Sequence, residues 1–556
     1  MAPSGALGSA TKARPMMATT VAPTTARRPP FARTEARRST MPPGTTGGDV
    51  VSGTLPAYGR ESATGHRRDG AVLAGAWLLL ASSRVIGPRL AGDINPVLVA
   101  PWSFGRLAMS AVCAMVVVRV ASRGRVTLAV VAVLAAGSML GAMGWADHSR
   151  VERGAWSGTA VVVGDVEWRS GAARAVLSIN GRRHWVFAGG ASGRALARAE
   201  SGQPLHVEGI RVPEVADGLV RGASRHVVGR FEPLSIAPIA GRHPSPLQRS
   251  ATRARRAVAR GASHLPPREA SLFLGLAIGD DAGQPAALTA AFRAAGLSHL
   301  TAVSGQNVAY VLALAAPMVS RRTPGVRVAM SLVLLGWFVV VTRAEPSVVR
   351  AAAMAAVGVV ARSRGFDAPA ARVLAITMGA LLIVDPLLAQ SVGFVLSCAA
   401  TTGLVLVTPR LAPLVGGPSW WRAAVATSLG AQIAVAPVTL AVFGTAPVVA
   451  LPANLLAVPV AGAVMLVGMP AAAVLGALDG VAEWVGVGIG PLGALVALPL
   501  GAAVRWVWWV AEVASRANLP PVADAAGWGC IAAFLLHRSV RLRSWPSSSS
   551  RATTIG

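Results

Sequence analysis

Apolar residues form blocks along this chain that are far longer than those of a soluble protein. The blocks recur from about residue 71 to residue 536, and many approach the roughly 20 residues that a membrane-spanning helix needs. They lie near 71–88, 104–121, 126–146, 299–318, 326–342, 346–361, 370–385, 388–408, 422–442, 450–475, 483–503 and 522–537. The pattern predicts a polytopic α-helical membrane protein with about ten to thirteen crossings.

Residues 150–245 interrupt this pattern with short β-rich runs. The runs read GTAVVVGDVEW, ARAVLSIN, RHWVFA, PLHVEGIR and RHVVGRF, and the second joins the third through Asn180-Gly181, a dipeptide typical of tight hairpin turns. Five short strands in a stretch of this length indicate a small β-barrel of the OB type. The expected fold class is therefore a polytopic α-helical membrane protein with an inserted small extracytoplasmic β-barrel domain.

The same patterns divide the chain into five regions. These are a disordered basic tail (1–70), N-terminal transmembrane segments (71–149), the OB-like β domain (150–245), a transmembrane core (246–540) and a second disordered tail (541–556). Arg123 and Arg125 make a loop between early apolar runs basic, which predicts that the N-terminus lies inside and residue 150 outside. The stretch 265–297 is too broken for a clean span, and we expect it to be re-entrant or interfacial.

Composition agrees with the membrane class and leaves the partner open. Charged residues make up 14% of the chain, whereas a soluble domain has about 25%. The net charge of +28 favours anionic partners, although basic residues also flank the membrane helices of any such protein. Three cysteines far apart in sequence fit neither a disulfide framework nor a metal site. We expect no metal and no cofactor.

The barrel region carries the features of a surface for single-stranded nucleic acid. It has 13 arginines against 8 acidic residues, with aromatic residues interleaved at Trp156, Trp168, Trp185 and Phe187. Positive charge tracks a phosphate backbone and aromatic rings stack bases. Barrel cores also bury aromatic residues, so the sequence leaves both interpretations open.

Residues 296–311 read GLSHLTAVSGQNVAYV and place polar residues inside an apolar block. If the stretch is one helix, His299, Gln306, Asn307 and Ser304 share roughly half of its circumference with Tyr310. Hydrocarbon would leave their hydrogen-bonding groups unsatisfied. They therefore either line a hydrated cavity or join neighbouring helices.

A second polar stretch, AEPSVVRAAAM, spans residues 344–354. Pro346 suits the first turn of a helix and Glu345 suits its cap. Arg350 lies one turn inside, where an unpaired arginine would cost about 2.5–3.5 kcal/mol on insertion scales. Arg343 and Arg350 either present their guanidinium groups to one pathway or pair with carboxylates such as Glu345 or Asp385.

A third stretch, residues 430–462, interrupts apolar sequence with Gln432, Asn454 and four prolines. The prolines are Pro437, Pro447, Pro452 and Pro459. Broken helices are tolerated at membrane depth where the freed backbone lines a cavity or is buried in protein. Ordinary kinks and loop ends are the alternative.

These stretches, in this order, resemble the ComEC family of competence proteins. The family pattern GLSHLLAISGLHV corresponds to GLSHLTAVSGQNV here, with His299, Ser304 and Gly305 in register. Its Pro-Ser-x-x-Arg-Ala pattern corresponds to residues 346–351, and PANLLAVPV corresponds to its ANLLAIPL-like run at Asn454 and Pro459. A further pattern is matched at Asp385, Pro386, Gly393, Phe394, Ser397, Ala399 and Thr401. The resemblance covers about residues 70–537.

The resemblance implies a multi-pass channel in the cytoplasmic membrane that admits one DNA strand during natural transformation, with the barrel outside. The expected DNA path comprises His299, Ser304, Gly305, Gln306, Asn307, Arg343, Arg350, Gln432 and Asn454. The expected structural motif residues are Pro346, Asp385, Gly393, Phe394, Ser397 and Pro459. One departure is Gln306-Asn307, where the family has Leu-His, so no role of that histidine carries over.

The implied partners are single-stranded DNA, the lipid bilayer and a protein that delivers DNA from outside. The chain has no G-x-x-x-x-G-K-[ST] loop, so we expect a soluble motor inside. It has no His-x-His-x-Asp-His signature, so we expect strand degradation to come from a separate nuclease. Whether the chain forms a homo-oligomer stays open.

Two other functions compete with the DNA channel. One is a transporter of another anionic or lipid substrate on the same scaffold. The other is an intramembrane serine hydrolase with Ser304 as nucleophile and His299 as base. Their spacing separates them by about 140° on one helix, which is poor for a hydrogen bond. We therefore expect no catalytic residue in this chain.

Overall fold

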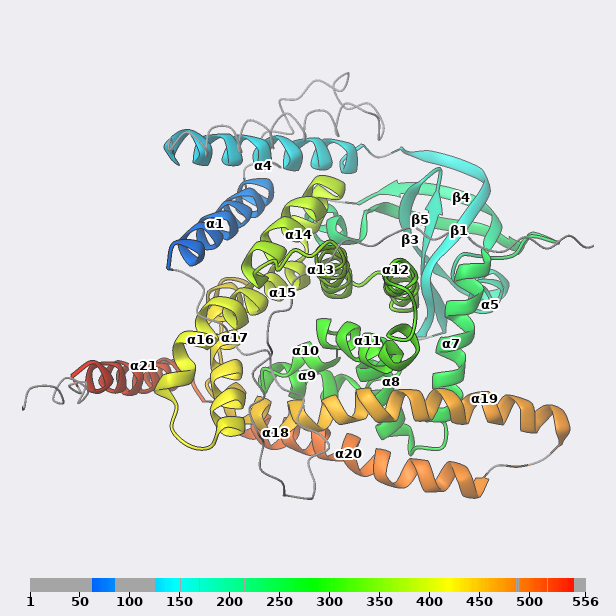
Figure 1. Cartoon of the computed structure of the whole chain (residues 1–556). Helices are drawn as coiled ribbons and strands as arrows, with labels where there is room; N and C mark the ends of the chain where they lie inside the picture. Colours follow the sequence, from blue (N-terminus) through cyan, green and yellow to red (C-terminus); the bar gives the residue numbers. More distant parts are fainter. Residues whose placement is uncertain are drawn as a thin grey trace, which may run out of the picture. The chain divides into compact units, whose positions relative to one another are not determined.

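A computed structural model describes residues 63–85, 126–150 and 152–544, apart from positions 170, 215, 302, 487, 489 and 518. These residues belong to the compact unit Glu61–Gly556. They form many helices and one closed five-stranded barrel (Figure 1). The prediction of a helical chain with an inserted small barrel is therefore confirmed for this part of the chain.

Several regions expected from the sequence lie wholly or mostly outside the described residues. The apolar segment near 104–121 is one of them, and so are nearly all of the two expected tails. The described helices reach into both tails, because α1 begins at Ala63 and α21 (Pro521–Ser544) ends at Ser544.

The barrel contains the five predicted strands. They are β1 (Gly154–Arg169), β2 (Ala172–Ile179), β3 (Arg182–Ala188), β4 (Pro204–Pro213) and β5 (Val227–Pro238). Their order around the barrel is β1-β2-β3-β5-β4, with β3 parallel to β5 and the other neighbours antiparallel. The turn Asn180-Gly181 has φ values of 51° and 79°, as a type I′ hairpin requires.

Alternation of buried and outward-facing side chains builds the barrel core. Every second residue of β2 is buried, from Ala173 to Ile179, because successive side chains of a strand point to opposite faces. Between β3 and β4 the chain forms α5 (Gly190–Ala197), whose Leu196 is fully buried in the same core. A short helix, α6 (Ala216–Gly222), precedes β5.

Five described helical segments are long and apolar enough to cross a membrane. They are α12 (Pro324–Val341), Val392–Leu414, α17 (Ser419–Phe443), Ala450–Val485 and α20 (Gly490–Arg516). Segment Val392–Leu414 contains α15 (Val392–Thr402) and α16 (Thr408–Leu411), joined by a π-helical turn. Segment Ala450–Val485 contains α18 (Ala450–Ala463) and α19 (Met469–Val485), which are also joined by a π-helical turn. Fewer spans are described than the sequence predicted, partly because other apolar helices are shorter, such as α14 (Ala370–Val384).

The structure also describes further helices. They are α1 (Ala63–Val85), α4 (Val126–His148), α7 (Pro246–Ala262), α8 (Pro267–Ile278), α9 (Ala286–Ala294), α10 (Ser298–Thr301), α11 (Gly305–Val319) and α13 (Pro346–Ser363). The broken stretch 265–297 corresponds to the short helices α8 and α9.

Small residues allow α7 and α19 to pack backbone against backbone. A Cβ added at Gly261 would lie 2.0 Å from the carbonyl oxygen of Ala472, and one added at Gly476 would lie 1.9 Å from that of Ala257. Each helix thus contributes two small residues spaced four apart, which is the pattern of closely packed membrane helices. This contact fixes α7 against α19 (Figure 1).

Candidate functional site

The polar stretch near residue 300 is broken instead of forming one helix. Helix α10 ends at Thr301, Ser304 has extended backbone angles (φ −97°, ψ 164°), and α11 begins at Gly305. A helical wheel drawn through His299 and Tyr310 therefore does not apply, and the predicted single helix is wrong. Ser304 is the N-cap residue of α11, a position that serine favours.

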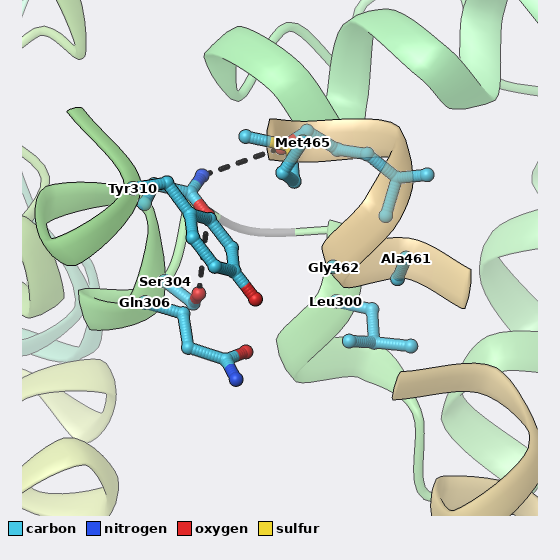
Figure 2. A pocket seen from close by; sticks show the side chains of 9 residues that line it. Leu300, Ser304, Gln306, Tyr310, Ala461, Gly462 and Met465 are labelled. Carbon is cyan, nitrogen blue, oxygen red and sulfur yellow. Dashed lines mark hydrogen bonds between the residues drawn. The ribbon is translucent and has the colours of Figure 1, made fainter. Parts of the chain in front are cut away.

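The break creates a pocket between α11 and α18. Its lining residues are Leu276, Leu300, Ser304, Gln306, Asn307, Tyr310, Ala461, Gly462 and Met465. Figure 2 shows the Tyr310 hydroxyl and the Gln306 amide reaching into the space beside Leu300. Three of the predicted path residues (Ser304, Gln306 and Asn307) thus line one pocket.

Hydrogen bonds fix the polar side of this pocket. The Ser304 hydroxyl donates to Asn307 Oδ1 at 3.4 Å, and Asn307 Nδ2 donates to the carbonyl oxygen of Leu276 at 3.4 Å (Figure 2). Asn307 is buried, so it braces α11 against α8, whereas Gln306 is exposed and free to meet a ligand.

The opposite wall depends on a glycine and a π-helical turn. A Cβ added at Gly462 would lie 2.7 Å from the Tyr310 hydroxyl oxygen, so glycine makes room for that hydroxyl. Met465 lies in the π-helical turn Val464–Gly468. Such turns are frequent at functional sites, because they place side chains off the regular helical register.

Arg350 lies behind the break, in the first turns of α13. Its guanidinium is 6% exposed and donates from Nε to Ser397 Oγ at 2.8 Å and from Nη1 to Met354 Sδ at 3.0 Å. A Cβ added at Gly305 would lie 2.9 Å from Arg350 Nη2, so the start of α11 approaches the guanidinium closely. Among the described residues no carboxylate forms an ion pair with Arg350. A buried positive charge therefore lies beside the positive end of a helix.

The motif residues around Arg350 hold local structure. Pro346 occupies the first turn of α13 after Glu345 at the cap, as predicted, and the adjacent Ser347 hydroxyl donates to the carbonyl oxygen of Val303 in the break at 2.6 Å. Asp385 Oδ1 accepts from the Leu387 amide at 3.1 Å and caps the turn Pro386–Gln390.

The remaining motif residues lie on two helices. Gly393 and Phe394 lie in the first turn of α15, where Phe394 is fully buried, and Ser397 on the same helix accepts the hydrogen bond from Arg350. Pro459 lies inside α18.

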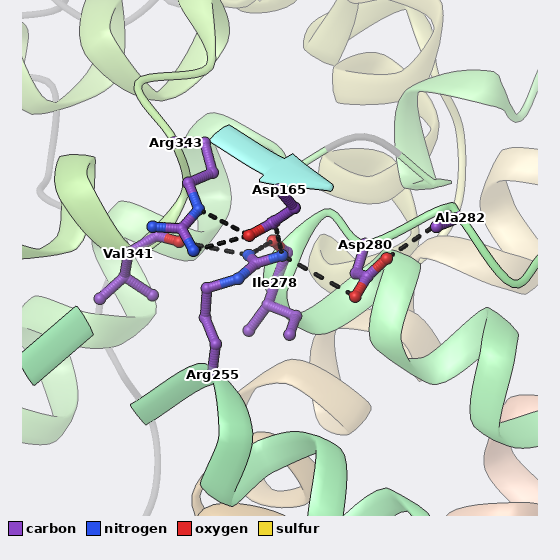
Figure 3. A network of polar contacts seen from close by, with 7 residues as sticks. All are labelled: Asp165, Arg255, Ile278, Asp280, Ala282, Val341 and Arg343. Carbon is purple, nitrogen blue, oxygen red and sulfur yellow. Dashed lines mark hydrogen bonds and ion pairs between the residues drawn. The ribbon is translucent and has the colours of Figure 1, made fainter. Parts of the chain in front are cut away.

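Arg343 pairs with neither of the carboxylates considered from the sequence. Its Nε and Nη2 donate to Asp165 Oδ1 of β1 at 3.1 and 2.6 Å (Figure 3). The carboxylate of Asp385 instead meets His226 Nε2 at 2.9 Å. The barrel region therefore contacts the helices through both of these pairs.

The proline-rich third stretch is less interrupted than expected. Pro437 lies inside α17 and Pro459 inside α18, and the chain leaves helical structure only between Phe443 and Ala450. Asn454 donates from Nδ2 to the Ala450 carbonyl oxygen of its own helix at 2.7 Å, so it braces α18.

Gln432 differs from Asn454, because its amide has no partner. Both of its side-chain polar atoms are buried without a hydrogen bond among the described residues, and so is the Ser428 hydroxyl one turn earlier. The two residues share one face of α17. Buried polar groups without protein partners mark positions for water or a ligand.

His299 lies apart from the pocket. It is exposed on α10, and Ser304 has Asn307 as its hydroxyl partner. The pairing of Ser304 with His299 that a serine hydrolase would need is therefore not formed. The part of the chain that the structure describes also contains no group of three His, Cys, Asp or Glu residues that could hold a metal ion.

Comparison with family models decides the relationship. Residues 276–543 match the model described as Competence protein. This segment is a domain of the competence protein family. Comparison with curated proteins and with solved structures gives no match. The resemblance to ComEC proteins drawn from the motifs is thereby confirmed.

The competence domain contains the pocket, Arg350 and Gln432. Its match begins within α8 and ends within α21, so α1, α4, the barrel and α7 precede it. The barrel therefore contacts the competence domain through pairs such as His226 with Asp385 and Asp165 with Arg343.

The outer face of the barrel carries part of the predicted aromatic and basic surface. Arg174 on β2 lies 4.4 Å over the ring of Trp185 on β3 and 5.9 Å from that of Phe187, which is 52% exposed. Trp168 is also exposed, whereas Trp156 packs edge-to-face on buried Phe231 at 6.2 Å. Trp156 thus belongs to the barrel core, whereas nucleic-acid contact at the exposed aromatic residues stays a prediction.

Sequence reasoning missed Gly462 and Met465 in the pocket, and it named Tyr310 on the polar face without counting it among the path residues. It also missed Arg255, which joins the contact of Arg343 with Asp165. Arg255 could have been found from periodicity. It shares the face of α7 that carries the buried Ala251 and Val258, where an arginine is out of place.

Proposed function

We propose that this chain is an integral membrane channel that carries single-stranded DNA across the cytoplasmic membrane during natural transformation. The observation that carries the proposal is the pocket between α11 and α18, where Ser304, Gln306 and Tyr310 present polar groups inside the competence domain. An amide, a hydroxyl and an aromatic ring can contact a base without reading its sequence.

Charge and hydration within the domain support the same function. A polyanion crosses a bilayer only where cations or donors replace its water. Arg350 supplies a buried cation without a carboxylate partner among the described residues. The unpaired polar atoms of Ser428 and Gln432 supply positions for water on a helix that is apolar enough to span the membrane.

We also propose that the barrel is an OB-like domain that collects the strand outside the membrane. The strand order β1-β2-β3-β5-β4 and the helix between β3 and β4 support this assignment. The pairing of Arg174 with Trp185 and the exposed Phe187 support contact with a single strand, because the bases of a strand stack on exposed aromatic faces. A DNA-delivery protein outside, a soluble motor inside and a separate nuclease complete the proposal.

Passage of DNA through the purified chain in liposomes tests this function. Fluorescent single-stranded oligonucleotide added outside should become protected from added nuclease only in liposomes that contain the protein. A duplex of the same sequence should stay outside and remain sensitive to nuclease. Passage of a series of anionic lipids and small anions is measured in the same liposomes, and it tests the competing transporter function. Passage of those compounds without passage of the oligonucleotide would contradict the DNA channel.

A further inference from the structure

Three charged side chains from distant parts of the chain meet between the barrel and the competence domain. Arg255 of α7 donates from Nη2 to Asp165 Oδ2 at 2.6 Å, and Arg343, which follows α12, donates to Asp165 Oδ1 at 2.6 Å. Figure 3 shows the two guanidinium groups on either side of the one carboxylate. Asp280 lies further away, 3.9 Å from Arg255.

The helices hold Arg255 firmly, and Arg343 extends from strained backbone beside it. Arg255 is 7% exposed, and its Nη1 donates to the carbonyl oxygens of Ile278 at 2.7 Å and Val341 at 3.2 Å (Figure 3). Arg343 and Ala344 have φ values of 57° and 56°, which residues other than glycine rarely adopt. Strained backbone of this kind clusters at functional sites. The Arg255 guanidinium is therefore positioned whether or not Asp165 is present, whereas the Arg343 guanidinium donates its hydrogen bonds to Asp165 alone among the described residues.

Asp165, in contrast, is placed so that it can leave. Its side chain is 43% exposed, far more than those of its partners. The pairing of β1 with β2 is interrupted between Val163 and Glu167, so Asp165 lies on a bulge outside the ladder. The preceding Gly164 has φ of 80° and no atom within 4 Å of an added Cβ. Asp165 can therefore move without breaking strand pairing.

The charges require an anion at this position. Burial raises the pKa of the Asp165 carboxyl, but the charges and hydrogen bonds of Arg255 and Arg343 outweigh burial and hold that pKa below its usual value. The carboxylate is thus ionised and separates two cations that would otherwise face each other. Guanidinium groups bind carboxylate and phosphate oxygens with the same geometry. A phosphate could therefore replace the carboxylate between the two guanidinium groups.

We propose that Arg255 and Arg343 form a phosphodiester-binding site that Asp165 occupies in the absence of DNA. A backbone phosphate of the incoming strand displaces Asp165 as the strand passes from the barrel to the competence domain. This inference rests on the proposed function, and it adds the position at which the DNA backbone passes from the barrel to the competence domain. Arg343 is followed, seven residues later, by Arg350, so the next cation along the path belongs to the same segment.

The test uses the full chain in lipid nanodiscs and a fluorescent oligothymidylate, titrated over a salt series. Asp165→Asn should tighten binding about tenfold, equivalent to about 1.4 kcal/mol, because the competing carboxylate is gone. Each additional phosphate contact should steepen the dependence of log K on log salt by about 0.7. The matched control is Glu200→Gln, which changes the net charge equally but breaks the separate pair of Glu200 with Arg256 at 2.8 Å. It should leave affinity nearly unchanged.

A second variant keeps the inference testable if Asp165→Asn does not fold. Arg343→Gln removes one cation of the site and should weaken binding and flatten the salt dependence. Equal affinity of wild type and Asp165→Asn, equal gains for Asp165→Asn and Glu200→Gln, or unchanged binding by Arg343→Gln would each overturn the inference while leaving the DNA channel intact. Failure of the wild-type chain to bind the oligonucleotide at any salt concentration would instead overturn the proposed function together with this site.

Discussion

Replacing Arg350 by methionine should stabilise the protein and abolish DNA passage. An arginine at the centre of a membrane helix costs about 2.5–3.5 kcal/mol on insertion scales, which is an upper limit for Arg350 because it lies in the first turns of α13. Arg350 recovers part of this cost through its bonds to Ser397 and Met354, and losing the donor to Ser397 costs about 1 kcal/mol. Methionine is flexible enough to fill most of the space that the arginine leaves. We therefore expect Arg350→Met to be more stable by roughly 1–2 kcal/mol, in line with replacements of other buried charges.

Two measurements on the same purified variant check this prediction. Heat unfolding in one detergent should show a raised midpoint for Arg350→Met, and the liposome assay should show loss of oligonucleotide passage. The control is Arg350→Lys, which keeps the charge but loses the geometry of the bond to Ser397 and should retain part of the passage. A destabilised Arg350→Met would mean that the guanidinium is a structural brace. Normal passage would remove Arg350 from the DNA path.

Three other predictions follow from close contacts and from charge. Gly476→Val should force α7 and α19 apart and lower the free energy of unfolding by about 1–3 kcal/mol in heat unfolding, whereas Gly379→Val, with open space around its Cβ, should not. Gly462→Ala should push on the Tyr310 hydroxyl and slow oligonucleotide passage, and the added change Tyr310→Phe, which removes the clashing oxygen but keeps the aromatic ring, should restore part of it; no restoration would argue against a steric effect. The pKa of Asp165 is lowered in the folded protein, so its stabilising contribution should be full above about pH 4 and be lost as pH falls through that lowered pKa. The difference in unfolding temperature between wild type and Asp165→Asn should shrink in that range, and a constant difference would contradict the ion pairs.

Sequence patterns predicted those helices, strands and turns that depend on neighbouring residues alone. The alternation in β2 and the Asn180-Gly181 turn specify a hairpin through backbone preferences of the residues themselves. Pro346 at the first turn of α13 follows from its missing N–H group. The long apolar runs that became α12, α17 and α20 follow from hydrophobicity alone.

The arrangement of the site depends on contacts that sequence spacing does not show. The spacing predicts Ser304 on a continuous helix, although serine also favours the start of a new helix. The structure has a break before α11, and the hydrogen bond from the Ser347 hydroxyl to the Val303 carbonyl oxygen holds this break in place. The partner of Arg343 is Asp165, 178 residues earlier in the chain. Nothing in the sequence around either residue indicates that pairing, because it depends on how the barrel meets the helices.

Polar groups at membrane depth, we propose, line a hydrated path for a DNA strand. Single cysteines at Gln306 and Gln432, in a chain whose three native cysteines are replaced by alanine, test it most directly. Both should react with a membrane-impermeant thiol reagent and be protected by single-stranded oligonucleotide. A cysteine at Leu440, which is 52% exposed on the same membrane-length helix as Gln432, should face lipid and should not react. Unreactive thiols at Gln306 and Gln432, or reaction that the oligonucleotide leaves unchanged, would contradict the claim.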